Sequence, residues 1–198
     1  MKKIIFSTLF LLSVSFSFAQ SFNHGAGVGI FVLKSAGSDV TPAFSLSYSP
    51  RFNFIETERM SVSVGVPLNI GFSGSYYAGY NSYYGGYEEN TLGAFINVPA
   101  MMNLNIGAGS SKENESRLGF FAGAGYGLHW GNYGTVITDE YGYQHTEDKY
   151  AGKFGPAGNA GLRIAVGSHQ KNIEIRLSYM RIKQGSTNVY GVNTYFNF

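Results

Sequence analysis

The sequence predicts an all-β fold, a closed antiparallel up-and-down barrel of eight transmembrane strands. Three observations lead to this prediction. Apolar residues alternate with small or polar ones in segment after segment, charged residues make up only 13% of the chain, and the two longest connections fall at the same end. Alternation with a period of two is typical of strands whose two faces differ. Because a bilayer offers no hydrogen-bond partners, a sheet that crosses it must close on itself and turn its apolar face outward.

The clearest alternation runs from Met60 to Phe72, where every second residue is apolar and the residues between are small or polar. The same pattern recurs in seven further segments, 22–33, 42–54, 92–106, 117–130, 153–166, 171–183 and 188–198. Each is near or above the roughly ten residues that a tilted strand needs to cross a membrane. We expect Pro67, Pro99 and Pro156 to lie near bulges or strand ends, because proline cannot donate to the ladder.

The first residues predict export. Lys2 and Lys3 form a basic region, a short apolar stretch follows, and Ser17 and Ala19 supply the small residues of a cleavage site. We therefore expect a signal peptide over residues 1–19, cleaved after Ala19, and an outer-membrane barrel domain over residues 20–198. The alternative is a single N-terminal membrane anchor.

Composition excludes several classes of function. Removing Lys2 and Lys3 from the fourteen basic residues leaves twelve, which match the twelve acidic ones, so no basic surplus indicates nucleic-acid binding. The absence of cysteine excludes disulfides, thiolate metal sites and thiol nucleophiles. The competing fold is a soluble barrel of the lipocalin type, with its apolar face inward. Its outer face would then consist of Gly, Ser and Asn with almost no charge, which makes a poor aqueous surface.

The two long connections, 73–90 and 131–150, carry the functional signal. Short turns at the periplasmic end and long loops outside are the usual layout of outer-membrane barrels, so we expect both to be extracellular. Tyrosine mixed with Gly, Ser and Asn is typical of adaptable binding loops. The expected extracellular contacts are Tyr76, Tyr77, Tyr80, Tyr83, Tyr84, Tyr87, Tyr141 and Tyr143. The alternative is that these rings lie against lipid headgroups or extend the barrel wall.

A charge network is expected inside the barrel. Ile164 must face lipid together with Ile173, and a turn centred between Ser168 and His169 then sets Arg163 directly opposite Glu174. An unpaired buried charge is costly, whereas a paired one fills space. The predicted lumen network consists of Arg51, His129, Arg163, Glu174 and Arg176.

The final strand carries a resemblance. Its aromatic terminus and alternating apolar positions, Tyr190, Val192, Phe196 and Phe198, are similar to the insertion signal of the small eight-stranded outer-membrane β-barrel family. The family's glycine within that signal falls here at Asn193, with a glycine at Gly191 instead. The resemblance covers the whole mature chain. It implies a location in the outer membrane, lipid as the surrounding partner, and recognition of the last strand by the barrel-insertion machinery.

No catalytic constellation stands out among the four histidines, since none is followed by serine at strand spacing on the lipid face. We expect no cofactor, no metal and no enzymatic activity. The predicted function is a structural or surface-interaction role. The expected partner is an extracellular or envelope protein, whose identity the sequence leaves open. The alternatives are a narrow channel for small or apolar solutes and a lipid-modifying enzyme, because the same barrel serves several functions.

Overall fold

The computed structural model describes residues 21–34, 41–81, 85–138, 144–167, 171–182 and 187–198. The expected signal peptide, residues 1–19, lies outside these ranges, so its cleavage stays a prediction. Within the described ranges, no helix is long and apolar enough to cross a lipid bilayer.

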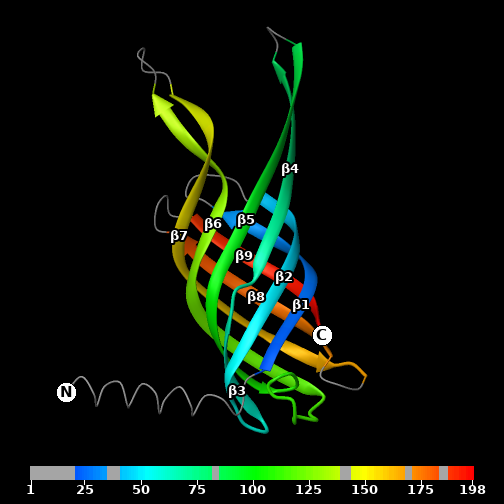
Figure 1. Cartoon of the computed structure of the whole chain (residues 1–198). Helices are drawn as coiled ribbons and strands as arrows, with labels where there is room; N and C mark the ends of the chain where they lie inside the picture. The colour runs from blue at the N-terminus through cyan, green and yellow to red at the C-terminus, as the bar shows by residue number, and fades with distance from the viewer. Residues whose placement is uncertain (1–20, 35–40, 82–84, 139–143, 168–170, 183–186) are drawn as a thin grey trace, which may run out of the picture.

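A single antiparallel sheet closes on itself (Figure 1). Its strands are β1 (Ser21–Lys34), β2 (Thr41–Glu56), β3 (Met60–Gly65), β4 (Leu68–Asn81), β5 (Gly85–Gly107), β6 (Leu118–Thr138), β7 (Gln144–Ala165), β8 (Asn172–Ile182) and β9 (Thr187–Asn197). Strand β1 pairs with β2 on one side and with β9 on the other, so the chain's first and last strands complete the barrel. The predicted fold class is confirmed.

Strands β3 and β4 share one position in the barrel, between β2 and β5, so the nine strands fill eight positions. The break between them falls at Val66 and Pro67. Across from it, the pairing of β5 is interrupted around Pro99, between Asn97, which pairs with β4, and Met101, which pairs with β3.

The third proline behaves in the same way. Pro156 directly precedes Ala157, the first β7 residue in the described register with β8. The ladder is interrupted at each proline, but at Pro99 and Pro156 on one side only, because both stay in register with β6 through Gly127 and Tyr126.

The two faces of the wall divide as the alternation predicts. Phe72 is 51% exposed on the outside, whereas Ser63 is 0% exposed inside. The outer surface carries a continuous belt of exposed apolar side chains that includes Ile30, Leu46, Val64, Leu104, Phe120, Ile164, Leu177 and Val192. This orientation is the reverse of a soluble lipocalin-type barrel, whose apolar face would line the interior.

The two segments expected to be long loops are largely strand, which corrects the prediction. The β4–β5 ladder continues to the Asn81–Gly85 pair, and the β6–β7 ladder continues to Thr138–Gln144. The two hairpins rise together at one end of the barrel, as expected of the two long connections (Figure 1). The sequence alternation fades in both segments, but tyrosine and threonine still favour extended backbone.

At the opposite end, the connections after β2 and β5 form compact turns. Gly107 and Gly109 adopt the left-handed φ values of 78° and 69° that favour glycine. The side chains of Ser111 and Asn114 donate to the carbonyl oxygen of Glu58, at 3.1 and 2.8 Å. These bonds join the turn after β5 to the turn after β2.

Candidate functional site

A cluster of charged side chains lies in the lumen near the end with the compact turns. Arg163 of β7 and Glu174 of β8 are directly paired across the ladder. Arg163 Nε donates to Glu174 Oε2 at 2.7 Å, and the two residues are only 1% and 0% exposed. The register expected from the lipid-facing isoleucines therefore brings the two side chains together in the lumen.

Two further guanidinium groups surround the same carboxylate. Arg176 donates through Nε to Glu174 Oε1 at 2.8 Å, and its second nitrogen also contacts that oxygen. Arg51 of β2 lies farther away, with its nitrogen 3.8 Å from Glu174 Oε2. Three cations thus converge on one anion, and both carboxylate oxygens accept charge-assisted hydrogen bonds.

Neutral side chains hold the guanidinium groups in place. Arg163 also donates to Asn105 Oδ1 at 3.0 Å, and Arg176 donates to Ser49 Oγ at 3.1 Å. Arg163 stacks over the ring of Phe121, 4.4 Å from its centroid, and Arg176 stacks over Tyr195 at 4.5 Å. Our sequence analysis missed Phe121 as part of this site. Its place among the small inward residues of β6 was the available signal.

The turn after β5 covers this cluster from the end of the barrel. Arg51 donates to the carbonyl oxygen of Gly109 at 3.0 Å, and Asn53 donates to that of Ser110 at 3.1 Å. Ser110 is fully buried, although it belongs to a turn. The turn and the charge cluster together close the lumen at this end.

His129 does not join the charge network, which corrects the prediction for this residue. It lies in the lumen, but it pairs with Asn97 and Lys153, whereas Arg163 pairs with Gly119 near the start of β6. Its ring stacks on Phe95 with centroids 5.3 Å apart. Sequence alternation predicts that His129 faces the lumen, but it does not predict how far along the barrel the side chain lies. His129 lies ten residues along β6 from Gly119, the partner of Arg163, which is too far to reach Glu174.

Large apolar side chains form a second closure around His129. Phe31 and Phe95 meet edge to face, with ring centroids 5.2 Å apart. The buried apolar cluster to which they belong also contains Ala43, Met101, Ala157, Met180, Ile182 and Val189. The lumen is therefore filled by charge near the compact turns and by apolar packing nearer the hairpins.

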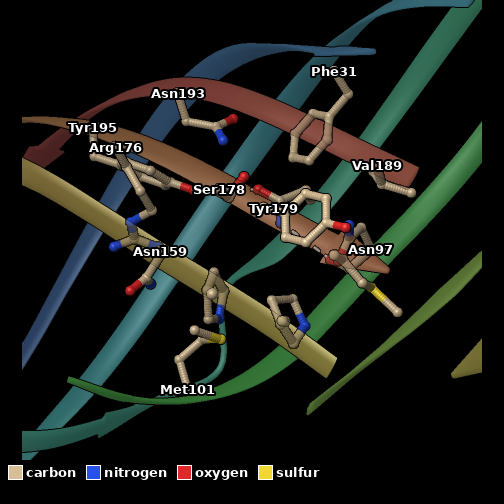
Figure 2. A pocket seen from close by; sticks show the side chains of 16 residues that line it. Phe31, Asn97, Met101, Asn159, Arg176, Ser178, Tyr179, Val189, Asn193 and Tyr195 are labelled. Carbon is tan, nitrogen blue, oxygen red and sulfur yellow. Dashed lines mark hydrogen bonds between the residues drawn. The ribbon is translucent and has the colours of Figure 1, made fainter. Parts of the chain in front are cut away.

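A small cavity lies between these two layers (Figure 2). Its volume is about 20 Å³, which is room for about one water molecule. Asn97, Asn159 and Asn193 line its polar part, and Phe31 and Met101 line its apolar part. The cavity is bounded by Arg176 and Tyr195 on the side of the charge cluster and by Phe31 and Met101 on the side of the apolar cluster.

The predicted tyrosine contacts lie in or between the extended hairpins. Tyr76, Tyr77 and Tyr80 are residues of β4 and Tyr87 belongs to β5, so these four are strand residues and not loop residues. Tyr83, Tyr84, Tyr141 and Tyr143 lie outside the described residues.

The four residues of the expected insertion signal all point outward from the last strand or its end. Tyr190, Val192, Phe196 and Phe198 are between 43% and 52% exposed. The backbone N–H of Phe198 donates to the carbonyl oxygen of His24 at 2.9 Å, and the rings of these two residues lie 4.4 Å apart. The terminal residue is therefore built into the seam between the last and first strands.

The described histidine side chains have structural contacts. His24 Nδ1 lies 3.2 Å from the hydroxyl of Tyr48, and His129 stacks on Phe95. Among the described residues, no group of three or more His, Asp or Glu side chains is arranged to hold a metal ion.

Closure of the sheet, the outward apolar belt and the filled polar interior define a transmembrane β-barrel. Its fold is that of the small eight-stranded outer-membrane barrels. The chain is similar in structure to Neisserial surface protein A, with a TM-score of 0.55 and 13% identity over 90% of this chain and 97% of the other. It is also similar to Ail, the attachment invasion locus protein of Yersinia pestis, with a TM-score of 0.50 and 11% identity over 91% and 99%.

No family model matches the sequence, and no curated protein matches it. The fold and the apolar belt place the protein in the outer membrane.

Proposed function

We propose that this protein is a closed, non-enzymatic outer-membrane barrel that presents two paired-strand hairpins to a partner at the cell surface. The observation that carries the proposal is the continuation of the β4–β5 and β6–β7 ladders as far as Asn81–Gly85 and Thr138–Gln144. A continuous ladder holds a hairpin in one orientation, which lowers the entropic cost of binding through it. The tyrosine-rich composition of these hairpins supplies contact area.

The filled lumen supports an interaction role over a channel. A conducting path would have to displace both the buried charge cluster around Glu174 and the apolar layer around Phe31 and Phe95. An eight-stranded barrel leaves room for little more than its own side chains. We therefore expect the purified protein to give no steady openings in a planar bilayer. Regular single-channel steps would instead support the narrow-channel alternative.

A photo-crosslinking residue at Asn81 or Gly85 tests the interaction role directly. In living cells each should form a discrete crosslinked product with an envelope or extracellular protein. The same residue at Glu113, in the turn after β5, serves as the control at the opposite end. The proposal fails if neither hairpin position yields a product, or if Glu113 yields the same one.

We also propose that the last strand directs insertion. Tyr190, Val192, Phe196 and Phe198 form one outward row, with Thr194 as the polar member between them. Such a row could be recognised by the barrel-insertion machinery before the seam with β1 closes. Removal of residues 1–19 during export belongs to the same proposal, and N-terminal sequencing of the mature protein tests it.

A further inference from the structure

We propose that the outer wall of β7, β8 and β9 binds a phosphorylated, acylated glycolipid of the outer leaflet, with an acyl chain in an apolar groove and a phosphate on Lys34 and Arg181. This site is separate from the hairpins and does not depend on which partner they bind. Two independent features of the wall meet here, a groove and a row of cationic side chains.

The groove lies on the lipid-facing surface. It has a volume of about 430 Å³ and is lined by Gly158, Asn159, Ala160, Leu177, Ser178, Tyr179, Tyr190, Gly191 and Val192. The outward residues of β7 here, Gly158 and Ala160, are small. The neighbouring outward side chains of β8, Leu177 and Tyr179, are large and well exposed. The wall is therefore hollowed along β7 and raised along β8.

The small floor continues onto the next strand. Ala124 pairs with Gly158, and Ala122 pairs with Ala160, so four adjacent outward positions carry at most a methyl group. The floor of the groove is apolar, and an apolar groove in hydrocarbon is filled by an apolar chain.

A cationic row crosses the top of the groove. Asn188 of β9 pairs with Lys34 of β1 on one side and with Arg181 of β8 on the other. Lys34 and Arg181 are both exposed and lie two strand spacings apart, about 10 Å. One phosphate group can accept hydrogen bonds from both long side chains at this separation.

Asn188 makes the row specific for an acceptor. The hydroxyl of Tyr179, on the groove wall, donates to Asn188 Oδ1 at 2.9 Å. This bond uses the amide oxygen of Asn188 and leaves both Nδ2 hydrogens available to donate to a ligand. The one acidic residue in β1, β8 and β9 is Glu174, which is buried in the lumen near the other end. The row is thus cationic and donor-rich, complementary to a phosphate.

The position of the row determines the leaflet. Lys34, Arg181 and Asn188 lie at strand ends on the same end of the barrel as the extended hairpins (Figure 1). In outer-membrane barrels the longer connections are extracellular, so the row lies at the level of the outer-leaflet headgroups. A lipid seated here would direct its acyl chain down the groove, past Tyr179 and Leu177.

The test measures the affinity of the purified full-length mature protein, in phosphatidylcholine nanodiscs, for bis-phosphorylated lipid A and for the same lipid after dephosphorylation. Each cation near an anionic lipid contributes about fivefold in affinity, so K34A/R181A should bind the phosphorylated lipid about 25-fold more weakly. Its affinity for the dephosphorylated lipid should not change. Arg181→Lys keeps the charge and should retain most of the binding.

A separate variant tests whether the groove holds an acyl chain. A Cβ atom added at Gly158 would meet nothing closer than 3.7 Å, so Gly158→Leu can fill the groove without disturbing the wall. We expect this variant to bind both lipids about tenfold more weakly than the wild type. Its folding is checked by heat-modifiable gel mobility. Ala26→Leu, at an exposed outward position of β1, is the matched control for added bulk, and R59A/K171A is the matched control for lost charge.

Three results would overturn the proposal. The first is unchanged affinity in K34A/R181A, or an equal loss in R59A/K171A. The second is a Gly158→Leu variant that binds both lipids as the wild type does, or no more weakly than Ala26→Leu. The third is displacement of lipid A by inorganic phosphate at equimolar concentration, which would show a free-anion site that needs no acyl chain.

Discussion

Arg163 and Glu174 face each other across the β7–β8 ladder, and their side chains form a 2.7 Å ion pair in the lumen near the end with the compact turns. Arg176 and Arg51 approach the same carboxylate. One anion therefore compensates three buried cations, so the stability of the cluster depends strongly on this single side chain.

Replacing Glu174 with Gln should destabilise the folded barrel by about 3 kcal/mol or more, because it leaves three guanidinium groups buried without their counter-charge. Urea unfolding of the purified barrel in lipid vesicles measures this difference. Glu115→Gln, an exposed carboxylate in the turn after β5, is the matched control and should change stability by less than about 0.5 kcal/mol.

A double-mutant cycle isolates the pair itself. Glu174→Gln combined with Arg163→Met should cost less than the sum of the two single changes, because removing both partners also removes the uncompensated charge. Strictly additive free energies of unfolding would show that the two side chains are not coupled.

Gly27 is required at the seam between the first and last strands. A Cβ atom there would lie 2.1 Å from the carbonyl oxygen of Thr194, a backbone atom that cannot move away without opening the β1–β9 ladder. We expect Gly27→Ala to destabilise the barrel by about 2 kcal/mol and to lower the folded fraction on gels. Gly158→Ala, where the nearest atom is 3.7 Å away, should fold normally. Equal folded fractions for the two variants would contradict the packing at this seam.

Deleting Phe198 should reduce the amount of inserted barrel severalfold while changing the stability of barrel already formed by only about 1 kcal/mol. The residue ends the outward row of the final strand and is half exposed, so its removal costs only the backbone hydrogen bond to His24 and the contact between the two rings. Quantifying folded protein in outer-membrane fractions, beside unfolding of the purified variant, separates the two effects. Phe120→Ala removes an equally exposed ring far from the terminus and should insert normally. Normal insertion of the deletion variant would count against a role in recognition.

The sequence predicted which face of each strand looks inward because alternation is a local property with a period of two. It also predicted the Arg163–Glu174 register, since Ile164 and Ile173 had to share the lipid face. It did not predict that His129 lies away from the charge cluster, because height along the lumen depends on the stagger of all the strands. The strands beyond Phe72 and Trp130 were also missed, since the sequence alternation fades in both segments.

Chemical labelling of single cysteines on intact cells tests the central claim most directly, because the chain contains no cysteine of its own. Asn81→Cys and Gly85→Cys lie at the end of the β4–β5 ladder, and Glu113→Cys lies in the exposed turn at the opposite end. A membrane-impermeant maleimide should label the first two on intact cells and the third only after the outer membrane has been permeabilised. Labelling of Glu113→Cys on intact cells, with the hairpin positions protected, would contradict a barrel that presents these hairpins at the cell surface.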